Sequence, residues 1–204
     1  WKPYVLLKTL EDPSLAWFSS VVVYSDAGAA FVGNFRESVL GLLEESDVVA
    51  SYSPMTEEEW TKRDAFEALE VVGPSVESGR QLRTGVIVAR KTPVSLRFFR
   101  LWLEACENLQ LISEEKSISG RESGRFRNHN DDQSLFSLLF KKFGFRGFYD
   151  NITKSFMKFV RNELKASLGV TLSGPWSDEA RKKLLDLAEE NARAYINEHA
   201  DTFL

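Results

Sequence analysis

The sequence contains very little cysteine and histidine. Cys106 is the single cysteine among 204 residues, which excludes an internal disulfide and a zinc site built from several cysteines. The two histidines, His129 and His199, are too few for a three-histidine metal site. No apolar run approaches the roughly 20 residues of a membrane span, and no segment resembles a signal peptide. We therefore expect no transmembrane segment in this chain.

An excess of basic residues is also absent. The chain has 26 lysines and arginines against 30 acidic residues, a formal net charge of −4. This balance argues against a broad surface for duplex nucleic acid, although a small local anion site stays open. Hydrophobic residues make up 43% and charged residues 27%, as in an ordinary globular domain. We expect no nucleic-acid partner and a cytoplasmic location, or the Golgi lumen if the chain is eukaryotic.

Short runs rich in β-branched residues alternate with longer helical patterns. The run at 21–24 is continuously β-branched and aromatic, which is typical of parallel strands covered on both faces, and the runs at 48–52 and 85–89 are two further predicted strands. Their alternation with helices predicts an α/β domain with a mostly parallel sheet flanked by helices. We assign this domain to residues 1–150 and expect a helical C-terminal extension over residues 151–204.

Three helix starts are specified by local sequence. Pro3 suits the first turn of a helix. Thr56 with Glu59 three residues later forms a capping box, which predicts a helix extending to about Leu69. Thr92 followed by proline supplies an N-cap and a first-turn proline for the helix after the third predicted strand.

One carboxylate directly follows the first predicted strand. Asp26 precedes Ala27 and Gly28, which are small enough to let a ligand approach the backbone. Ligands of open α/β sheets bind beyond the carboxyl ends of the strands, and a carboxylate there suits a divalent cation that also holds phosphate oxygens. Aspartate is also common in turns, and the bare pattern favours this second interpretation of Asp26.

A dense polar segment precedes the predicted helix that begins near Asp132. Residues 129–134 read HNDDQS and follow a polar loop over 113–130. An N-cap at Asp131 or Asp132 accounts for one of these side chains, and a solvated helix start is the alternative explanation for the others. Their density favours a site. A polar loop of this length is functional or disordered, so we expect a mobile lid over that site.

Arginines that could contact phosphate are spread along the chain, and the guanidinium fork suits phosphate geometry. Most of them are expected on the solvated surface. Arg80 and Arg83, just before the third predicted strand, are the exceptions to test. The sequence has no P-loop, GxGxxG or GxSxG motif, so a glycine-rich phosphate cradle is not expected.

Four stretches of the sequence resemble the motifs of one enzyme group. The opening WKPYVLLKTL resembles the group's YWxWKPYxIxxxL, and VVVYSDAG resembles its YxDAG strand end. RQLRTGVIVARKTPVSLRFFRLWLEAC resembles QxxAGxIxxRxTxxSxxFxxxWLxxC. HNDDQSLFSLLFKKFG resembles HRHDQSxxSLLxKKxG. The stretches occur in the group's order and cover about residues 1–145. With these motifs the chain resembles GT-A-type glycosyltransferases that build bacterial, viral and algal polysaccharides.

This resemblance implies a metal-assisted transfer of a sugar from a nucleotide-sugar donor to a glycan acceptor, with Mn²⁺ or Mg²⁺ as cofactor. It assigns Asp26 to the metal and the diphosphate, and it makes Asp132 and Gln133 the catalytic pair. A DQ pair after a GV strand also favours retention of anomeric configuration. With Asp132 facing the sugar, Asp131 is expected to cap the helix. Together with the residue patterns, the resemblance gives these donor contacts: Asp26, Ala27, Gly28, Arg80, Arg83, Gly85 and His129.

The chain departs from the group's pattern at several positions. Thr84 stands where the group prefers alanine, and Asn130 and Asp131 stand where it prefers arginine and histidine. Asp26 is the only carboxylate of the metal motif. The strand that binds the nucleobase in GT-A domains has no counterpart, so we expect it to be missing upstream of Trp1. The alternative function is therefore a non-catalytic GT-A-like module that binds a glycan or a protein, and turnover of a sugar nucleotide distinguishes the two.

Overall fold

The computed structural model describes residues 1–26, 30–31, 35–149 and 157–158. The chain divides into two compact units, and the larger one comprises Trp1–Asp26 with Arg36–Lys154. All residues discussed below as a functional site belong to this larger unit.

The second unit comprises Ala27–Phe35 and Ser155–Leu204. Its described part is a short antiparallel pair, β2 (Ala30–Phe31) with β5 (Met157–Lys158). The helical extension expected over residues 151–204 otherwise lies outside the described residues.

A three-stranded sheet forms the centre of the larger unit, in the order β1-β4-β3. Its strands are β1 (Val21–Ser25), β3 (Val48–Thr56) and β4 (Arg80–Arg90). β4 lies between the other two and runs antiparallel to both, so that Val88 pairs with Val23 on one side and Val49 on the other. β1 and β3 consequently run in the same direction without touching as neighbours.

The sequence-based prediction of a mostly parallel, GT-A-like sheet is wrong. Both strand pairs of this sheet are antiparallel. A continuous apolar run indicates that a strand is covered on both faces, but it does not determine whether the neighbouring strands are parallel or antiparallel. Ile87 and Val88 are adjacent on β4, point to opposite faces, and are both fully buried. The connection from β1 through α2 (Phe35–Leu42) does lead to a strand of the same direction, but β4 enters between them.

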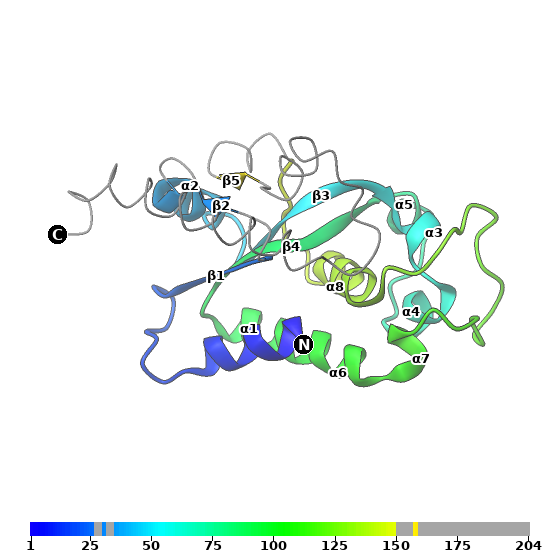
Figure 1. Ribbon diagram of the computed structural model, residues 1–204, viewed down its shortest axis with the longest axis horizontal. Helices are drawn as coiled ribbons and strands as arrows, with labels where there is room; N and C mark the ends of the chain where they lie inside the picture. Colours follow the sequence, from blue (N-terminus) through cyan, green and yellow to red (C-terminus); the bar gives the residue numbers. More distant parts are fainter. Residues whose placement is uncertain (27–29, 32–34, 150–156, 159–204) are drawn as a thin grey trace, which may run out of the picture. The chain divides into compact units, whose positions relative to one another are not determined.

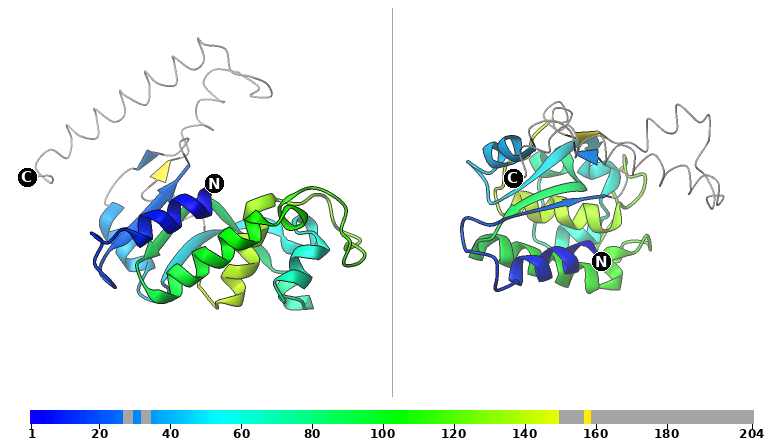
Figure 2. Two further views of the ribbon diagram at one scale, coloured as in Figure 1. Left: turned by 90° about the horizontal axis from the view of Figure 1, so that it is seen from below. Right: turned by 60° about the vertical axis from the view of Figure 1, so that its left-hand side comes forward.

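Three helices pack on one side of the sheet: α1 (Lys2–Glu11), α6 (Pro93–Glu107) and α8 (Asp131–Lys142) (Figures 1 and 2). The core between them is aromatic. Phe98 on α6 packs edge to face against Phe136 on α8, with ring centroids 5.3 Å apart. Such pairs add about 0.5–1.5 kcal/mol each to the free energy gained by burying the rings. This packing fixes the start of α8 relative to α1 and β4.

The capping signals at Thr56 and Thr92 are confirmed, but the helix expected from Thr56 to Leu69 is interrupted. Thr56 and Glu59 form the capping box of α3 (Glu57–Trp60). Thr61 then adopts an extended conformation, and the chain restarts as α4 (Arg63–Ala68). Thr92 caps α6 by accepting a hydrogen bond from the backbone of Ser95. Short helices α5 (Pro74–Glu77) and α7 (Leu109–Ile112) complete the unit. Across the described ranges, no helix combines the length and hydropathy that a membrane crossing requires.

A buried ion pair joins α3 to α8. The Glu57 side chain is fully buried, and its carboxylate accepts hydrogen bonds from Thr61, Ser137 and the Lys141 ammonium. Burial lowers the pKa of Lys141, although the neighbouring Glu57 carboxylate opposes this change. The side chains of Glu57, Thr61, Ser137 and Lys141 thus meet one another's hydrogen-bonding requirements where water has little access. Removing one charge of a buried ion pair lowers stability more than replacing both charges with apolar residues does.

Candidate functional site

Side chains from four elements meet around the ammonium group of Lys2. Lys2 begins α1 and donates a hydrogen bond of 3.1 Å to Thr84 Oγ1 on β4. Its Nζ also lies 3.5 Å from Asp132 Oδ2 on α8 and 3.9 Å from Asp26 Oδ1 at the end of β1. We call the set of Lys2, Tyr24, Asp26, Thr84, Gly85 and Asp132 the Lys2 site.

Strand geometry brings Asp26 to this place. Because β4 runs antiparallel to β1, the end of β1 lies beside the middle of β4, and the backbone N–H of Asp26 donates to Gly85 O over 2.9 Å. Tyr24 lies two residues earlier on β1, and its hydroxyl donates to Asp26 Oδ1 over 2.7 Å. Burial and this hydrogen bond raise the pKa of Tyr24, so the phenol stays protonated and keeps donating.

The other oxygen of the Asp26 carboxylate faces the open side of Gly85. A Cβ atom added at Gly85 would lie 3.4 Å from Asp26 Oδ2, so the glycine leaves a space there that a side chain would fill. The Asp26 side chain is 46% exposed. A Mg²⁺ or Mn²⁺ ion is held in many proteins by one or two carboxylates together with waters and substrate phosphates, and Asp26 fits that requirement. Within the described ranges no three acidic, histidine or cysteine side chains group as metal ligands.

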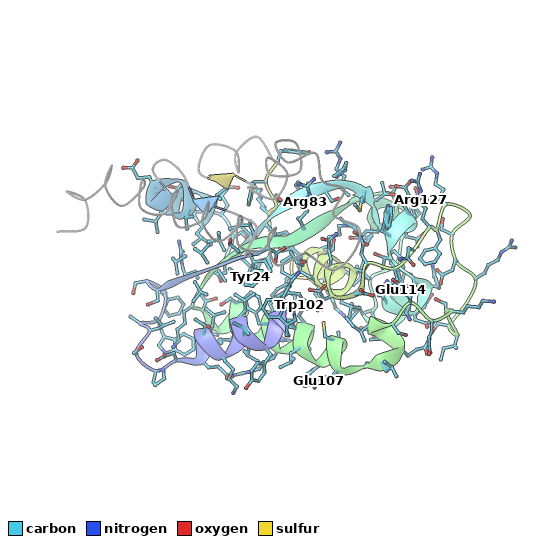
Figure 3. The ribbon with its side chains drawn as sticks, viewed as in Figure 1. Tyr24, Arg83, Trp102, Glu107, Glu114 and Arg127 are labelled. Atoms are coloured by element: carbon cyan, nitrogen blue, oxygen red, sulfur yellow. The ribbon has the colours of Figure 1, made fainter. Side chains whose placement is uncertain are left out.

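Asp132 is held in place through its own backbone. Its carbonyl oxygen accepts a 2.9 Å hydrogen bond from the indole Nε1–H of the buried Trp102 on α6. Figure 3 labels Trp102 and Tyr24, which approach this region from α6 and from β1. The Asp132 carboxylate lies in the first turn of α8, where the helix dipole favours a negative charge.

The prediction that Asp131 is the N-cap of α8 is wrong by one residue. Asn130 occupies the N-cap position, and no side chain makes the capping hydrogen bond of α8. Asp131 is exposed and has a backbone φ of +39°, a left-handed conformation that non-glycine residues adopt at a cost of about 1–3 kcal/mol. Residues under such strain cluster at functional sites, and this one directly precedes Asp132.

Gln133 is turned toward a neighbouring amide. Its Nε2 donates to Gln81 Oε1 over 3.0 Å, and Asn130 donates to the same oxygen. Gln81 is completely buried, and its own Nε2 bonds to Trp60 O, Thr61 Oγ1 and Ser134 Oγ. Gln81 thus holds the first turn of α8 against β4. Sequence reasoning gave Gln81 no role, although it is the glutamine of the QxxAGxI pattern, because a glutamine in a strand carries no signal of the contacts it will make.

Sequence reasoning also assigned no role to Lys2. One signal was available: a cation in the first turn of a helix opposes the helix dipole, and that turn of α1 has no acidic residue to offset it. Tyr24 was recognised as part of a strand and as the tyrosine of the YxDAG motif, but it was given no role. Its alternation with Asp26 along β1 becomes informative once the strand is known to end at Ser25.

His129 lies apart from this set and is bonded to the backbone through both ring nitrogens. It is 2% exposed. Nδ1 accepts from the backbone N–H of Lys62 over 3.2 Å, and Nε2 lies 2.8 Å from Leu111 O. This geometry requires the neutral ring with its proton on Nε2. The donor contact expected of His129 therefore has no open ring nitrogen to make it, and the residue instead ties the loop before α8 to α4 and α7.

His129 predicts a pH dependence of stability. Burial lowers its pKa from 6.5 to about 4, so the unfolded chain binds the proton more tightly than the folded one. The contribution of the neutral ring is complete above pH 6.5 and is lost as the pH falls through 4, which amounts to about 3 kcal/mol. Urea unfolding measured from pH 7 to pH 4 should show a shallower decline for His129→Gln than for the wild type. Parallel curves would contradict the assignment.

The remaining predicted donor contacts are distributed differently. Arg80 precedes Gly85 by five strand residues, about 17 Å along β4, and its guanidinium lies 5.8 Å from the centre of the Tyr149 ring. Arg83 is half-buried, and Figure 3 draws it on the opposite side of β4 from Trp102. Ala27 and Gly28 lie outside the described residues. Of the predicted site residues, the structure therefore brings together the donor contacts Asp26 and Gly85 and the catalytic candidate Asp132.

The loop over 113–130 is fastened to α3 and α4. The buried Asp64 carboxylate accepts hydrogen bonds from the backbone N–H groups of Ile118 and Ser119. The buried Lys62 ammonium donates to Ser113 O over 2.9 Å. In Figures 1 and 2 the loop extends beyond α4, away from the N-terminal end of α1. These contacts favour a structural role for the loop over the mobile lid expected from its composition.

The sequence matches no protein-family model and no curated protein. The function is therefore argued from the geometry of the Lys2 site and from the four sequence stretches that suggested a glycosyltransferase.

Proposed function

We propose that the protein transfers a sugar from a nucleotide-sugar donor to a glycan acceptor and that the Lys2 site is its active site. One observation carries the proposal. Asp26, Gly85 and Asp132 come from three different elements, and each was assigned to donor binding or catalysis from sequence alone. In the folded chain Lys2 lies close to both carboxylates, and Gly85 lies against one of them.

The residues can divide the work as follows. Asp26 Oδ2, in the space beside Gly85, would hold Mn²⁺ or Mg²⁺ together with the donor diphosphate. Such a cation supplies charge that stabilises the departing diphosphate. The Asp132 carboxylate, 32% exposed, stabilises the positive charge that develops at the anomeric carbon. Gln133 and Gln81 hold the first turn of α8 in position for this contact.

A cysteine-dependent reaction is not favoured. Burial raises the pKa of the Cys106 thiol to about 12, which leaves it protonated and unreactive near neutral pH. A glycan-binding module without turnover is the second candidate, because the same carboxylates and Thr84 hydroxyl could bind sugar hydroxyls. The cytoplasmic or Golgi location, the donor and the acceptor stay predictions.

The proposal is tested by turnover of sugar nucleotides. Purified protein is incubated with a panel of nucleoside diphosphate sugars, with Mn²⁺ or Mg²⁺, and the released nucleoside diphosphate is measured. Asp26→Asn should abolish metal-dependent donor binding in calorimetry and leave the melting temperature unchanged, because its side chain is half exposed. The matched control is Asp12→Asn, which removes the same charge at an exposed turn. Equal binding by both variants would contradict the role of Asp26.

Gly85→Ala tests the open side of Asp26 without removing a charge. The added methyl group would cover Oδ2 at 3.4 Å, a distance that ordinary contacts reach, so the protein should fold while donor and metal binding weaken. Gly41→Ala serves as its control, because no atom lies within 4 Å of a Cβ added there. Wild-type binding of glycan without turnover of any donor would favour the binding module instead.

A further inference from the structure

Lys2 occupies a position that its own helix disfavours. It is the first helical residue of α1, where the backbone N–H groups and the helix dipole present positive charge. No acidic residue of that first turn compensates for it. A residue that goes against the charge preference of its own helix is expected at functional sites.

The partners of the Lys2 ammonium are supplied by other elements. They are a hydroxyl at 3.1 Å and two carboxylates at 3.5 and 3.9 Å, from Thr84, Asp132 and Asp26. The Lys2 side chain is 18% exposed, so water replaces few of these interactions. The ammonium therefore neutralises much of the field that the two carboxylates would otherwise direct at a metal ion.

We propose that Lys2 is the resident cation of the site and competes with a divalent cation for Asp26 when no donor is bound. This inference rests on the proposed function, in which the metal arrives beside the donor diphosphate. The donor brings the negative charge that lets a second cation enter. Binding of metal is then coupled to binding of donor, and the metal alone binds weakly to the wild-type protein.

The size of the effect follows from Coulomb's law. A dication on Asp26 would lie a few ångströms beyond the Lys2 ammonium, in a site that is half exposed to water. Even with the dielectric constant of water, removing one positive charge about 6 Å from a dication raises the affinity for the dication by about tenfold.

The experiment uses Mn²⁺ alone, without any nucleotide, and measures free Mn²⁺ by electron paramagnetic resonance during titration of the protein. Lys2→Gln removes the charge and keeps a donor for Thr84, and Lys2→Met is a second charge-free variant. Lys8→Gln is the matched control, since Lys8 lies on the same helix with 60% of its side chain exposed and pairs with Glu11. We expect Mn²⁺ to bind about tenfold tighter to the Lys2 variants than to the wild type or to Lys8→Gln.

A further variant locates the ion. Adding Asp26→Asn to Lys2→Gln should return Mn²⁺ affinity to the wild-type level or below. Equal affinities of wild type and both Lys2 variants, or tightening that survives Asp26→Asn, would overturn the inference. Neither result depends on turnover. The proposed function instead fails if the wild type acts on no donor, which the Mn²⁺ titration does not measure.

Discussion

Asp132→Asn should lower the rate of sugar transfer by at least about 100-fold while the protein stays folded. The amide keeps the shape of the side chain and removes the charge that, in the proposed function, faces the reacting sugar. Losing one group that stabilises developing charge reduces turnover by about 100- to 1,000-fold in other enzymes. Because the contact strengthens in the transition state, kcat should fall with little change in KM. Initial rates with the best donor and acceptor, together with melting temperatures, provide the measurement.

The neighbouring residue supplies a matched control. Asp131→Asn removes the same charge one position earlier, and asparagine tolerates the +39° φ of this position at least as well as aspartate. The side chain is exposed and caps no helix, so neither turnover nor stability should change much. A large kinetic effect of Asp131→Asn with none for Asp132→Asn would show that Asp131 is the one that faces the sugar. Equal rates for both variants and the wild type would remove this helix start from the site.

Lys141→Met should produce the largest loss of stability among the changes considered. The variant leaves the Glu57 carboxylate fully buried without a counter-charge, although the Thr61 and Ser137 hydroxyls still donate to it. Breaking a buried pair in this way lowers the free energy of unfolding by about 3–5 kcal/mol. Urea unfolding at neutral pH measures the change. Lys142→Met is the control, because that lysine is exposed on the same helix.

The double variant separates the ion pair from the packing of its side chains. Glu57→Gln with Lys141→Met removes both charges, so stability should recover toward the wild-type value. A double variant as unstable as Lys141→Met alone would show that packing of the lysine stem, and not its charge, holds α3 to α8.

Local signals in the sequence identified several elements of this fold correctly. The capping box at Thr56 and the N-cap at Thr92 depend on residues within one helical turn, so they can be predicted from the local sequence alone. The apolar runs that form β1, β3 and β4 were recognised for the same reason. The break at Thr61 was missed: Thr61 has an extended backbone, and its hydroxyl accepts a hydrogen bond from Gln81, twenty residues away along the chain.

The direction of the strands was predicted incorrectly because pairing is a non-local property. Burial on both faces produces the same apolar run in parallel and antiparallel sheets, and β4 is separated from β1 by more than fifty residues. Whether His129 is free to contact a donor also depends on tertiary structure. A polar residue in a polar segment looks available for ligands, but here the fold buries it and bonds both nitrogens to the backbone.

The sequence by itself determined that Asp26, Gly85 and Asp132 deserved attention, since each lies in a stretch with recognisable neighbours. Only the tertiary structure decided that they meet. Antiparallel pairing of β4 with β1 places Gly85 beside Asp26, and packing of α6 against α8 places Asp132 opposite them. The Lys2 ammonium became visible only then, because its partners lie on β1, β4 and α8 and no spacing along the chain connects them.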